Sequence, residues 1–431
     1  MSSRVPEGWE AASLNELCKF SGGSAFKEKY QGKTSGDYPF IKVSDMNLDG
    51  NQRFITKANN WIDQDVKTEA KVNLFPVSAV VFAKVGAALL LNRRRILTRQ
   101  TAIDNNMMAA IPNNDDNNFL YYLLQDVDLG EIVQGGAVPS VNQSQMEDIP
   151  ALIPPLPEQQ KIATILSSVD DVIEKTRAQI DKLKDLKTGM MQELLTKGIG
   201  HTEFKDSPVG LIPAGWEVKC LPEIATYQNG KAFPSSDYLS SDKDGCYLVK
   251  PVNLDPDGRV NWNYKSTTKL SRTYWKSAEN YRVGPHEILM NLTAQSLDDD
   301  FLGRVCITRE GDKCILNQRI ARIAANEDEV LQKYLFWALK GNFFRSHVER
   351  ITQGSKVQHL YNSNLDEALI AFPTSILEQK KICALLNSLE SAIYGKSQKL
   401  AKLKSTKKAL MQDLLTGKVR ANITDKESAV V

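Results

Sequence analysis

Three short motifs contain residues that can handle phosphate groups. Gly32-Lys33-Thr34 looks like the end of a phosphate-binding loop, but that loop needs a glycine five positions before Gly32, and Lys27 stands there. Glu69–Lys71 and Glu217–Lys219 have the Glu-x-Lys order that ends a nuclease site, but neither has a well-placed acidic partner. We therefore expect a chain without a catalytic site of its own.

Cysteine and histidine usage predicts neither a metal site nor a disulfide framework. The six cysteines form no CxxC pair, and none of the four histidines lies near a cysteine cluster. We expect most of the cysteines to be small core residues; they are Cys18, Cys220, Cys246, Cys306, Cys314 and Cys383.

Side chains that can read nucleic-acid bases gather at one place in the first half of the chain. Arginine, asparagine and glutamine read base edges through paired hydrogen bonds, and arginine and lysine also neutralise phosphates. A solvated loop or strand edge is the alternative interpretation. The residues are Asn92, Arg93, Arg94, Arg95, Arg99 and Gln100.

The second half has comparable residues at roughly comparable places. Glycines flanked by glutamine, serine or lysine at 134–136 and 353–356 suit a tight loop near a backbone phosphate, although an ordinary turn explains them equally well. Lys42 in the first half and its aligned counterpart Lys250 in the second are also predicted DNA contacts. The remaining predicted DNA contacts are Gln134, Asn291, Gln295, Arg304, Gln318, Arg319, Gln353, Ser355 and Lys356.

The chain is a tandem repeat. `PEGWE` at 6–10 recurs as `PAGWE` at 213–217, and `IVQGGAVPSVNQS` at 132–144 aligns with `ITQGSKVQHLYNS` at 351–363. Matching is sparse before position 157 but dense and free of gaps between 158–196 and 378–416. The pattern indicates one shared mechanical element that is used twice, with two differently specialised modules.

Each module is predicted to be α+β. Short β-type runs at 38–43, 80–85, 247–252 and 304–308 alternate with Gly, Asn and Asp turn signals, and helical patches occur at 117–127 and 330–344. We expect recognition modules at 1–155 and 201–374, long helices at 156–200 and 375–420, and a flexible tail at 421–431.

The shared element has the period of a coiled coil. Apolar residues recur in steps of four and three, which is a coiled-coil seam. We expect the two helices to pair antiparallel within the chain; self-association is the alternative. The seam residues are Ile162, Leu166, Val169, Ile173, Ile180, Leu183, Met190 and Leu194, then Ile382, Leu386, Leu389, Ile393, Leu400, Leu403, Leu410 and Leu414.

Polar residues interrupt the seam at matched positions. Thr176 corresponds to Lys396, and Lys187 corresponds to Lys407. They mark either a partly exposed seam end or a device that controls the register of the helices. Pro157, the Ser375–Glu378 capping spacing, and Gly198 and Gly417 supply helix start and stop signals.

The composition limits the cellular compartment and the kinds of partner that we expect for this chain. The chain has 431 residues, 42% of them hydrophobic, which predicts two or more globular domains. No apolar run reaches the roughly 18 residues of a membrane span, and the first residues lack the layout of a signal peptide, so we expect a cytoplasmic protein without membrane contact. A net charge of only +2 counts mildly against a nucleic-acid role unless partners share the clamping.

The order of motifs resembles the specificity subunit of type I restriction–modification enzymes. `PPLPEQQKIATIL`, `VGLIPAGW` at 209–216 and `LEQKKICALL` followed by `LMQDLLTGKVR` carry the resemblance over essentially the whole chain. The second helix departs from it by having `TSIL` where the first has `PPLP`.

The resemblance implies two target-recognition domains, each reading one half of a split site in double-stranded DNA. It also implies that the helices fix the gap between the half-sites and dock two methyltransferase subunits, to which two motor-nuclease subunits add. S-adenosylmethionine, Mg and ATP would belong to those partners, and this chain would hold no cofactor. The rivals are a coiled-coil adaptor whose modules bind proteins, and a DNA enzyme with an unrecognised site.

Overall fold

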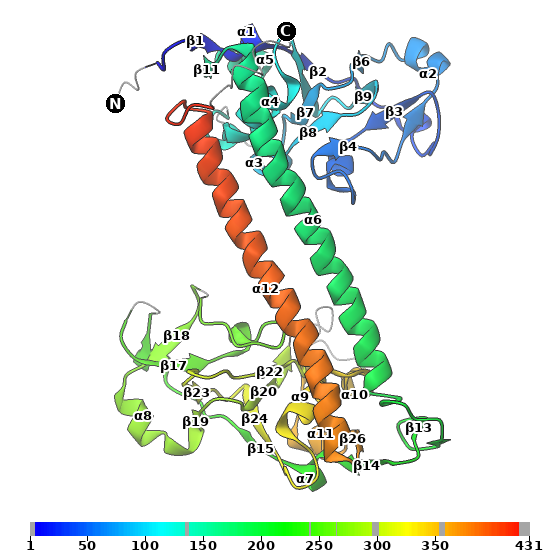
Figure 1. Ribbon diagram of the computed structural model, residues 1–431, viewed down its shortest axis with the longest axis vertical. Coiled ribbons are helices and arrows are strands. Elements are labelled where there is room, and N and C mark those ends of the chain that lie inside the picture. The colour runs from blue at the N-terminus through cyan, green and yellow to red at the C-terminus, as the bar shows by residue number, and fades with distance from the viewer. Residues whose placement is uncertain are drawn as a thin grey trace. The chain divides into compact units, whose positions relative to one another are not determined.

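The computed structural model of the protein describes residues 5–133, 138–240, 243–263, 265–294, 301–352 and 358–421. The chain forms two compact units (Figure 1). The first unit consists of Met1–Arg177 with Gln398–Val431, and the second unit is Ala178–Ser397. Each unit therefore combines one globular domain with parts of both long helices.

The domain of the first unit contains a five-stranded sheet and a four-stranded sheet. The five-stranded sheet has the order β2 (Cys18–Gly22), β10 (Met107–Pro112), β7 (Val80–Ala83), β8 (Arg94–Leu97), β4 (Phe54–Ile55). The four-stranded sheet has the order β5 (Trp61–Ile62), β3 (Tyr38–Ile41), β9 (Thr101–Ile103), β6 (Leu74–Phe75). β1 (Glu10–Ser13) pairs with β11 (Pro150–Ile153). The helices are α1 (Leu14–Leu17), α2 (Gln64–Glu69), α3 (Ala87–Leu90), α4 (Asn117–Asp126) and α5 (Gln143–Glu147), with 3₁₀ turns η1 (Glu28–Tyr30), η2 (Val43–Asn47) and η3 (Leu129–Glu131).

The domain of the second unit repeats this plan. One sheet has the order β15 (Ala225–Asn229), β24 (Ile320–Ala325), β20 (Ile288–Asn291), β22 (Val305–Ile307). The other has the order β16 (Tyr238–Leu239), β18 (Thr268–Leu270), β17 (Cys246–Val249), β23 (Cys314–Leu316), β19 (Arg282–Val283). Three strand pairs are β12 (Phe204–Lys205) with β13 (Ile212–Pro213), β14 (Trp216–Cys220) with β26 (Leu369–Pro373), and β21 (Thr293–Ala294) with β25 (Gln358–His359). The helices are α7 (Leu221–Ile224), α8 (Thr273–Ser277), α9 (Gln332–Lys340), α10 (Asn342–Thr352) and α11 (Asn362–Asp366), with 3₁₀ turns η4 (Ser235–Asp237), η5 (Pro251–Asn253) and η6 (Glu279–Tyr281).

A parallel strand pair lies at the centre of one sheet in each domain. β3 pairs in parallel with β9, and β17 pairs in parallel with β23. Gly23 and Gly230 lie at equivalent places of the two domains and pass directly over the ends of these pairs. A Cβ atom at either glycine would overlap the carbonyl oxygen of Asp104 or Asn317. The two domains therefore share the same close contact between backbone segments, and only glycine leaves enough space at this position.

The two long helices are α6 (Leu156–Leu194) and α12 (Ile376–Leu414), with 39 residues each. In the first unit, the start of α6 packs with the end of α12 through Ile162, Leu166 and Leu414. In the second unit, the end of α6 and the start of α12 enter one core, which contains Leu194 and Ile382. The helices therefore run antiparallel, as the seam predicted, and the fold is α+β with a repeated plan.

The seam residues lie on the protected face of each helix, while most residues between them are exposed. This distribution is that of an amphipathic helix with one packed stripe. Gly198 and Gly417 follow the two helices with φ values of +67° and +68°. The buried seam residues are Ile162, Leu166, Ile173, Ile180, Leu194, Ile382, Leu386, Ile393 and Leu414, and the half-buried ones are Val169, Leu183, Met190, Leu389, Leu400, Leu403 and Leu410.

The cysteines lie mostly inside the domains. All six cysteines are free thiols; Cys18, Cys306, Cys314 and Cys383 are buried, and the other two are half-buried. The described residues contain no cluster of His, Cys, Asp or Glu that could hold a metal ion. No helix within the described ranges has the length and apolarity needed to cross a membrane.

Candidate nucleic-acid interface

The ends of the parallel strand pairs hold predicted DNA contacts, Lys42 alone in the first domain and Lys250, Gln318 and Arg319 together in the second. The first loop edge consists of Lys42 after β3, of Asp104, Asn105 and Asn106 after β9, and of Ser24, which is bridged to Asp104. The second loop edge consists of Lys250 after β17, of Asn317, Gln318 and Arg319 after β23, and of Lys231, which is bridged to Asn317. Isolated bridges between Ser24 and Asp104, and between Lys231 and Asn317, hold the two edges in the same way.

Lys42 and Lys250 occupy the same structural position. Each precedes a 3₁₀ turn, and its backbone N–H donates to the side chain three residues later, Asp45 at 2.7 Å and Asn253 at 3.0 Å. Their ammonium groups lie near aromatic rings, with Lys42 at 5.8 Å from the Phe26 centroid and Lys250 at 4.0 Å from that of Tyr238. The turn fixes the backbone, and the ring orients a half-exposed cation.

The two loop edges differ in charge. The second edge carries three cationic side chains, Lys231, Lys250 and Arg319, whereas the first carries Lys42 and the carboxylate of Asp104. Partial burial lowers the pKa of Lys250, and the nearby charge of Arg319 lowers it further. Lys250 also donates to Thr268 at 2.8 Å, and Lys42 donates to Gln31 at 2.5 Å. One scaffold therefore presents two chemically different surfaces.

The arginine run at 93–95 does not form one exposed patch. Arg94 is only 1% exposed and donates to the Val127 carbonyl oxygen at 2.7 Å and to Asn92 at 3.0 Å. Burial lowers the pKa of Arg94 to about 10. Because alternate residues of a strand face opposite sides, Arg94 on β8 points into the domain and is not exposed to a DNA partner.

The neighbouring arginines lie beside the turn that begins after Lys42. Arg93 donates to the side chain of Asn47, and Arg95 donates to the Met46 carbonyl oxygen at 3.0 Å. Burial lowers the pKa of Arg95, so this guanidinium is partly committed to the fold. In the second domain, Arg304 similarly donates to the Leu254 carbonyl oxygen at 3.2 Å, next to η5. These arginines support the turns that carry the loop-edge lysines.

Other predicted contacts lie elsewhere in the domains. Asn92 accepts from Leu129 N at 2.9 Å and donates to Asp128 at 2.6 Å, which fixes its left-handed backbone at a φ of +52°. Asn291 is fully buried and donates to the carbonyl oxygens of Thr293 and Phe301. Arg99 and Gln100 are exposed, but they precede β9 and so lie at the end opposite Asp104.

Five predicted contacts lie outside the described residues. They are Gln134, Gln295, Gln353, Ser355 and Lys356. The predicted tail at 421–431 is likewise outside them, apart from Ala421, which is 6% exposed and belongs to the core of the first unit.

Sequence reasoning missed an aromatic groove of about 580 Å³ in the second domain. Tyr247 and Trp262 stack at 4.6 Å between centroids, and Trp275 completes the aromatic lining beside Lys276 and Lys313. Aromatic residues interleaved with basic ones at 262–276 were the signal for it. The groove opens at the start of β17 and β23, at the end opposite the second loop edge.

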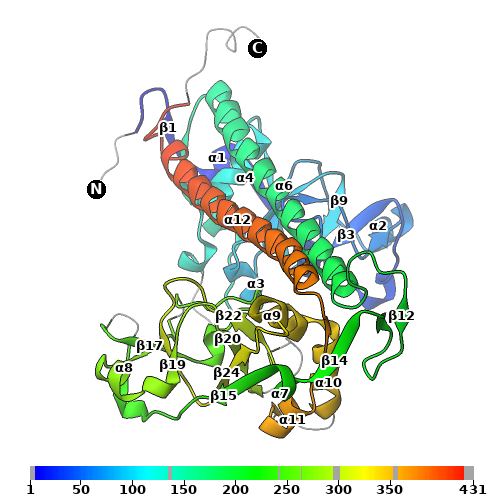
Figure 2. The same ribbon diagram turned by 60° about the horizontal axis from the view of Figure 1, so that its bottom comes forward.

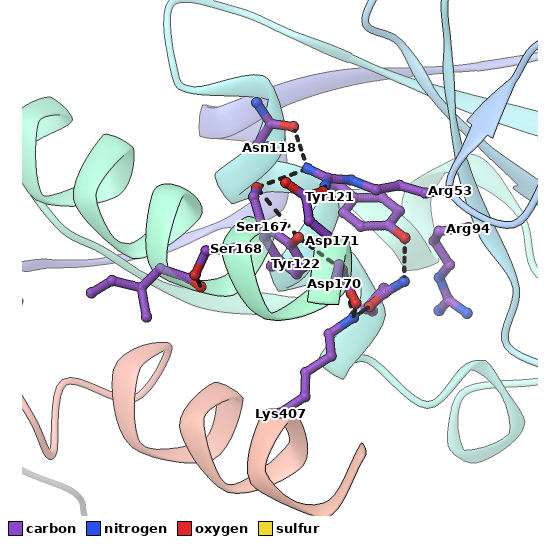
Figure 3. Close-up of polar contacts among 12 residues, drawn as sticks. Arg53, Arg94, Asn118, Tyr121, Tyr122, Ser167, Ser168, Asp170, Asp171 and Lys407 are labelled. Carbon is purple, nitrogen blue, oxygen red and sulfur yellow. Dashed lines mark hydrogen bonds and ion pairs between the residues drawn. The ribbon is translucent and has the colours of Figure 1, made fainter. Parts of the chain in front are cut away.

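In the first unit, polar contacts fasten the domain to the helix pair (Figure 3). Arg53 donates to Asn118 at 3.0 Å and to Ser167 on α6 at 2.8 Å, and its guanidinium carbon lies 5.6 Å from the Tyr122 ring centroid. Tyr122 donates to Asp170 at 2.8 Å, and Lys407 from α12 reaches the same carboxylate. The domain and both helices thus share one network.

In the second unit, the corresponding junction is more aromatic. α9 lies against the start of α12 (Figure 2), and Trp337 donates from its indole nitrogen to Asn387 at 3.1 Å. Asn387 is the repeat counterpart of Ser167. A groove of about 430 Å³ remains beside this contact, where the Arg259 guanidinium stacks 3.6 Å from the Tyr394 ring centroid.

A glutamate near the start of each long helix, buried Glu158 and half-buried Glu378, joins distant segments of each unit. Glu158 accepts from the Trp9 indole nitrogen at 3.0 Å, from Arg420 at 2.7 Å and from Ala421 N at 3.2 Å. Glu378 accepts from Trp216 at 3.4 Å and Ile199 N at 3.0 Å, and its Oε1 lies 2.8 Å from the His201 ring nitrogen. Each carboxylate joins the start of one helix, the tryptophan of the repeated `P-x-GWE` motif and the segment after the other helix.

The next residue of each helix completes this arrangement. Gln159 accepts from Asp116 N at 3.0 Å and donates to the Pro154 carbonyl oxygen at 3.0 Å. Gln379 accepts from Leu331 N at 2.8 Å and donates to the Pro373 carbonyl oxygen at 2.9 Å. The `EQ` pair that the two helices share in sequence is therefore the joint between each helix and its own domain.

Comparison with known proteins gives a consistent result over the whole chain. Residues 6–185 and 213–405 each match the family described as type I restriction modification DNA specificity domain. The specificity subunit of the type I restriction enzyme MjaVIII from Methanocaldococcus jannaschii is 26% identical over 421 residues, which cover 97% of this chain and 94% of the relative. The MjaIX specificity subunit of the same organism is 22% identical, with 97% and 95% covered.

Solved structures agree on the fold. The crystal structure of a type I restriction–modification S subunit from M. genitalium superposes with a TM-score of 0.59 at 13% identity, covering 96% of this chain and 98% of the other. A chain from a structural study of complex assembly in the type I system superposes with a TM-score of 0.54 at 15% identity, covering 96% and 100%.

Proposed function

Because the chain belongs to the type I restriction modification DNA specificity family, we propose that it selects the DNA sequence on which a restriction–modification complex acts. Each domain reads one half of a bipartite site in double-stranded DNA through its loop edge. The observation that carries the proposal is the pair of loop edges, built alike on Lys42 and Lys250 but different in charge. A protein-binding adaptor would not need cations held at equivalent points of two divergent domains.

The test is a domain exchange. Residues 1–150 are replaced by the aligned segment of a related specificity subunit, and methylated adenines are mapped in the genome of a host that expresses the complete complex. We expect one half of the recognised sequence to change while the other half stays the same. A change in both halves contradicts the assignment of one half-site to each domain, and DNA-independent assembly without sequence-specific methylation favours the adaptor.

The long helices are proposed to set the distance between the half-sites and to dock two methyltransferase subunits, to which two motor-nuclease subunits add. Two facts support this role. The helices have the same length of 39 residues, and both carry large apolar side chains outside the seam, with Leu186, Leu377 and Leu385 exposed by 50%, 62% and 42%. These exposed leucines are the positions at which we expect the partner subunits to contact the helices.

The catalytic chemistry is assigned to the partners. We propose that this chain is a non-catalytic subunit that acts in the cytoplasm, and that S-adenosylmethionine, Mg and ATP bind to the methyltransferase and motor-nuclease subunits. The failure of Gly32–Thr34, Glu69–Lys71 and Glu217–Lys219 to match complete motifs supports this division. The isolated chain is expected to be inactive in methylation and cleavage assays in which the assembled complex is active.

A further inference from the structure

Two lysines interrupt the apolar seam at equivalent positions of the two long helices. Lys187 on α6 and Lys407 on α12 occupy the same place in the repeat. Each meets a carboxylate of the opposite helix, Glu390 for Lys187 and Asp170 for Lys407, and these two acids are also equivalent in the repeat. One cross-helix ion pair therefore lies in each unit.

The pair in the first unit is largely shielded from solvent. Lys407 Nζ lies 2.8 Å from Asp170 Oδ1, and the two side chains are 15% and 17% exposed. Lys407 also donates to the side-chain oxygen of Gln125 on α4 at 3.1 Å. Tyr122 donates to the carboxylate of Asp170 (Figure 3). Burial lowers the pKa of Lys407, although the charge of Asp170 acts in the opposite direction.

The pair in the second unit has the same geometry. Lys187 Nζ lies 2.7 Å from Glu390 Oε2, with side chains 16% and 12% exposed. The Lys187 ammonium also lies 5.9 Å from the ring centroid of Trp337 on α9. In both units, a helix of the recognition domain thus contacts the ion pair that joins α6 to α12.

The apolar seam alone does not define the register of α6 against α12, that is, which residues of the two helices lie opposite each other. Because its residues recur every seven positions, a slip of one heptad still places apolar side chains opposite apolar side chains. The same slip moves an acid by about 10.5 Å along its helix, since each residue rises about 1.5 Å. The lysine would then remain in the seam without its carboxylate, and a shielded charge without a partner disfavours that alignment.

We propose that Lys187–Glu390 and Lys407–Asp170 are positioning residues that fix the register of α6 against α12, and with it the number of base pairs between the two half-sites. This inference rests on the proposed function of the helices as a spacer. The apolar residues supply the affinity of the helices for each other. The two ion pairs act along the seam, together with the contacts of Glu158 and Glu378 at the helix ends, to select one alignment among those that the heptad repeat allows.

The experiment replaces both ion pairs by apolar residues in the full chain: Lys187→Met, Glu390→Leu, Lys407→Met and Asp170→Leu. Apolar replacements of buried ion pairs are typically neutral or stabilising, so the helical signal and the unfolding midpoint should be kept. Methylated adenines are then mapped in a host that expresses the complex. We expect the two half-sites to be unchanged but the spacer to become mixed, with additional lengths differing by about 3 base pairs, because one heptad equals about 10.5 Å.

Charge reversal provides a second readout. Lys187→Glu alone places two carboxylates together, so site-specific methylation should fall or spread over several spacers. Adding Glu390→Lys restores an ion pair of opposite polarity and should restore the original single spacer. Lys396→Met is the matched control, because Lys396 is also a seam lysine that reaches the other helix, but it contacts an uncharged Gln179 at an exposed place.

Two results would overturn the inference: a folded apolar variant that methylates only the original spacer, or a folded reversed pair that fails to rescue Lys187→Glu. Failure of the proposed function looks different, because the unmodified complex itself would then methylate no bipartite site.

Discussion

The carboxylate of Glu158 receives hydrogen bonds from two segments that are far apart in the sequence: Trp9 near the start, and the neighbouring Arg420 and Ala421 near the end. Burial alone would raise the pKa of Glu158, but the bonds from Arg420 and Trp9 outweigh it, and the pKa lies below its usual range. The negative charge of Glu158 is thus part of the folded state of the first unit.

Replacing Glu158 by glutamine should destabilise the first unit by about 1.5–3 kcal/mol, the usual contribution of hydrogen bonds to a charged group. A carboxyl group whose pKa is lowered on folding stabilises the protein above its unfolded pKa, and this contribution is lost as the pH falls through the folded value. The difference between wild type and Glu158→Gln should therefore be largest near neutral pH and shrink below about pH 4.5. Urea unfolding at several pH values measures it; a difference that does not depend on pH would contradict the charged role.

Lys340 is a residue at which the two units differ. It corresponds to Gln125 in the first unit, where the amide accepts from Lys407. Burial and the neighbouring charge of Lys187 lower the pKa of Lys340 to about 8. The second unit therefore holds two ammonium groups, Lys187 and Lys340, near Glu390, whereas the first unit has the uncharged amide of Gln125 at the position of Lys340.

Replacing Lys340 by glutamine or methionine should stabilise the second unit at pH 7 by roughly 1–3 kcal/mol, because about 1.4 kcal/mol corresponds to each unit of pKa. A lysine whose pKa falls on folding penalises the folded state below the folded pKa, and the penalty disappears as the pH rises to the unfolded value. Wild type should accordingly gain stability between about pH 8 and 10.5, and the variants should not. Thermal unfolding from pH 7 to 10.5 tests this, with Gln125→Ala as the control site.

At the scale of elements, periodicity predicted the helices well but not the orientation of single polar residues. The seam from Ile162 to Leu194 could be predicted because many side chains repeat the same preference. Arg94 and Asn291 look like exposed base readers in the sequence, yet both are buried, because the alternation of a short strand is set by sheets that form between distant segments. Lys42 and Lys250 could be matched through the repeat, but their rings, Phe26 and Tyr238, could not.

The length of α6 and α12 should determine the spacer. Inserting one heptad into each helix, after Thr176 and after Lys396, preserves the seam and lengthens each helix by about 10.5 Å. We expect the spacer between the methylated half-sites to increase by up to about 3 base pairs without a change in the half-sites. Insertion of two residues in each helix breaks the seam and should abolish assembly with the methyltransferase subunits. An unchanged spacer after the heptad insertion would exclude the helices as the measuring element.

At the scale of the whole molecule, a net charge of +2 is small for a DNA-binding protein, so its positive charge must act locally. Cations gather at both ends of β17 and β23 in the described part of the second domain. At one end is the second loop edge with Lys231, Lys250 and Arg319, and at the other is the aromatic groove with Lys276 and Lys313. They lie at opposite ends of β17 and β23, so measurements can assign the DNA contacts to one of them.

Salt dependence discriminates between the two places, because each phosphate contact that is removed makes the slope of log K against log salt shallower by about 0.9. For the assembled complex, the variant Lys231→Gln, Lys250→Gln, Arg319→Gln should lower the slope by up to about 2.7, and Lys42→Gln in the first domain should lower it by about 0.9. The double variant Lys276→Gln, Lys313→Gln should leave the slope unchanged. The opposite result, a shallower slope for the groove variant alone, would move the DNA contacts of the second domain to the groove and leave the loop edge with a structural role.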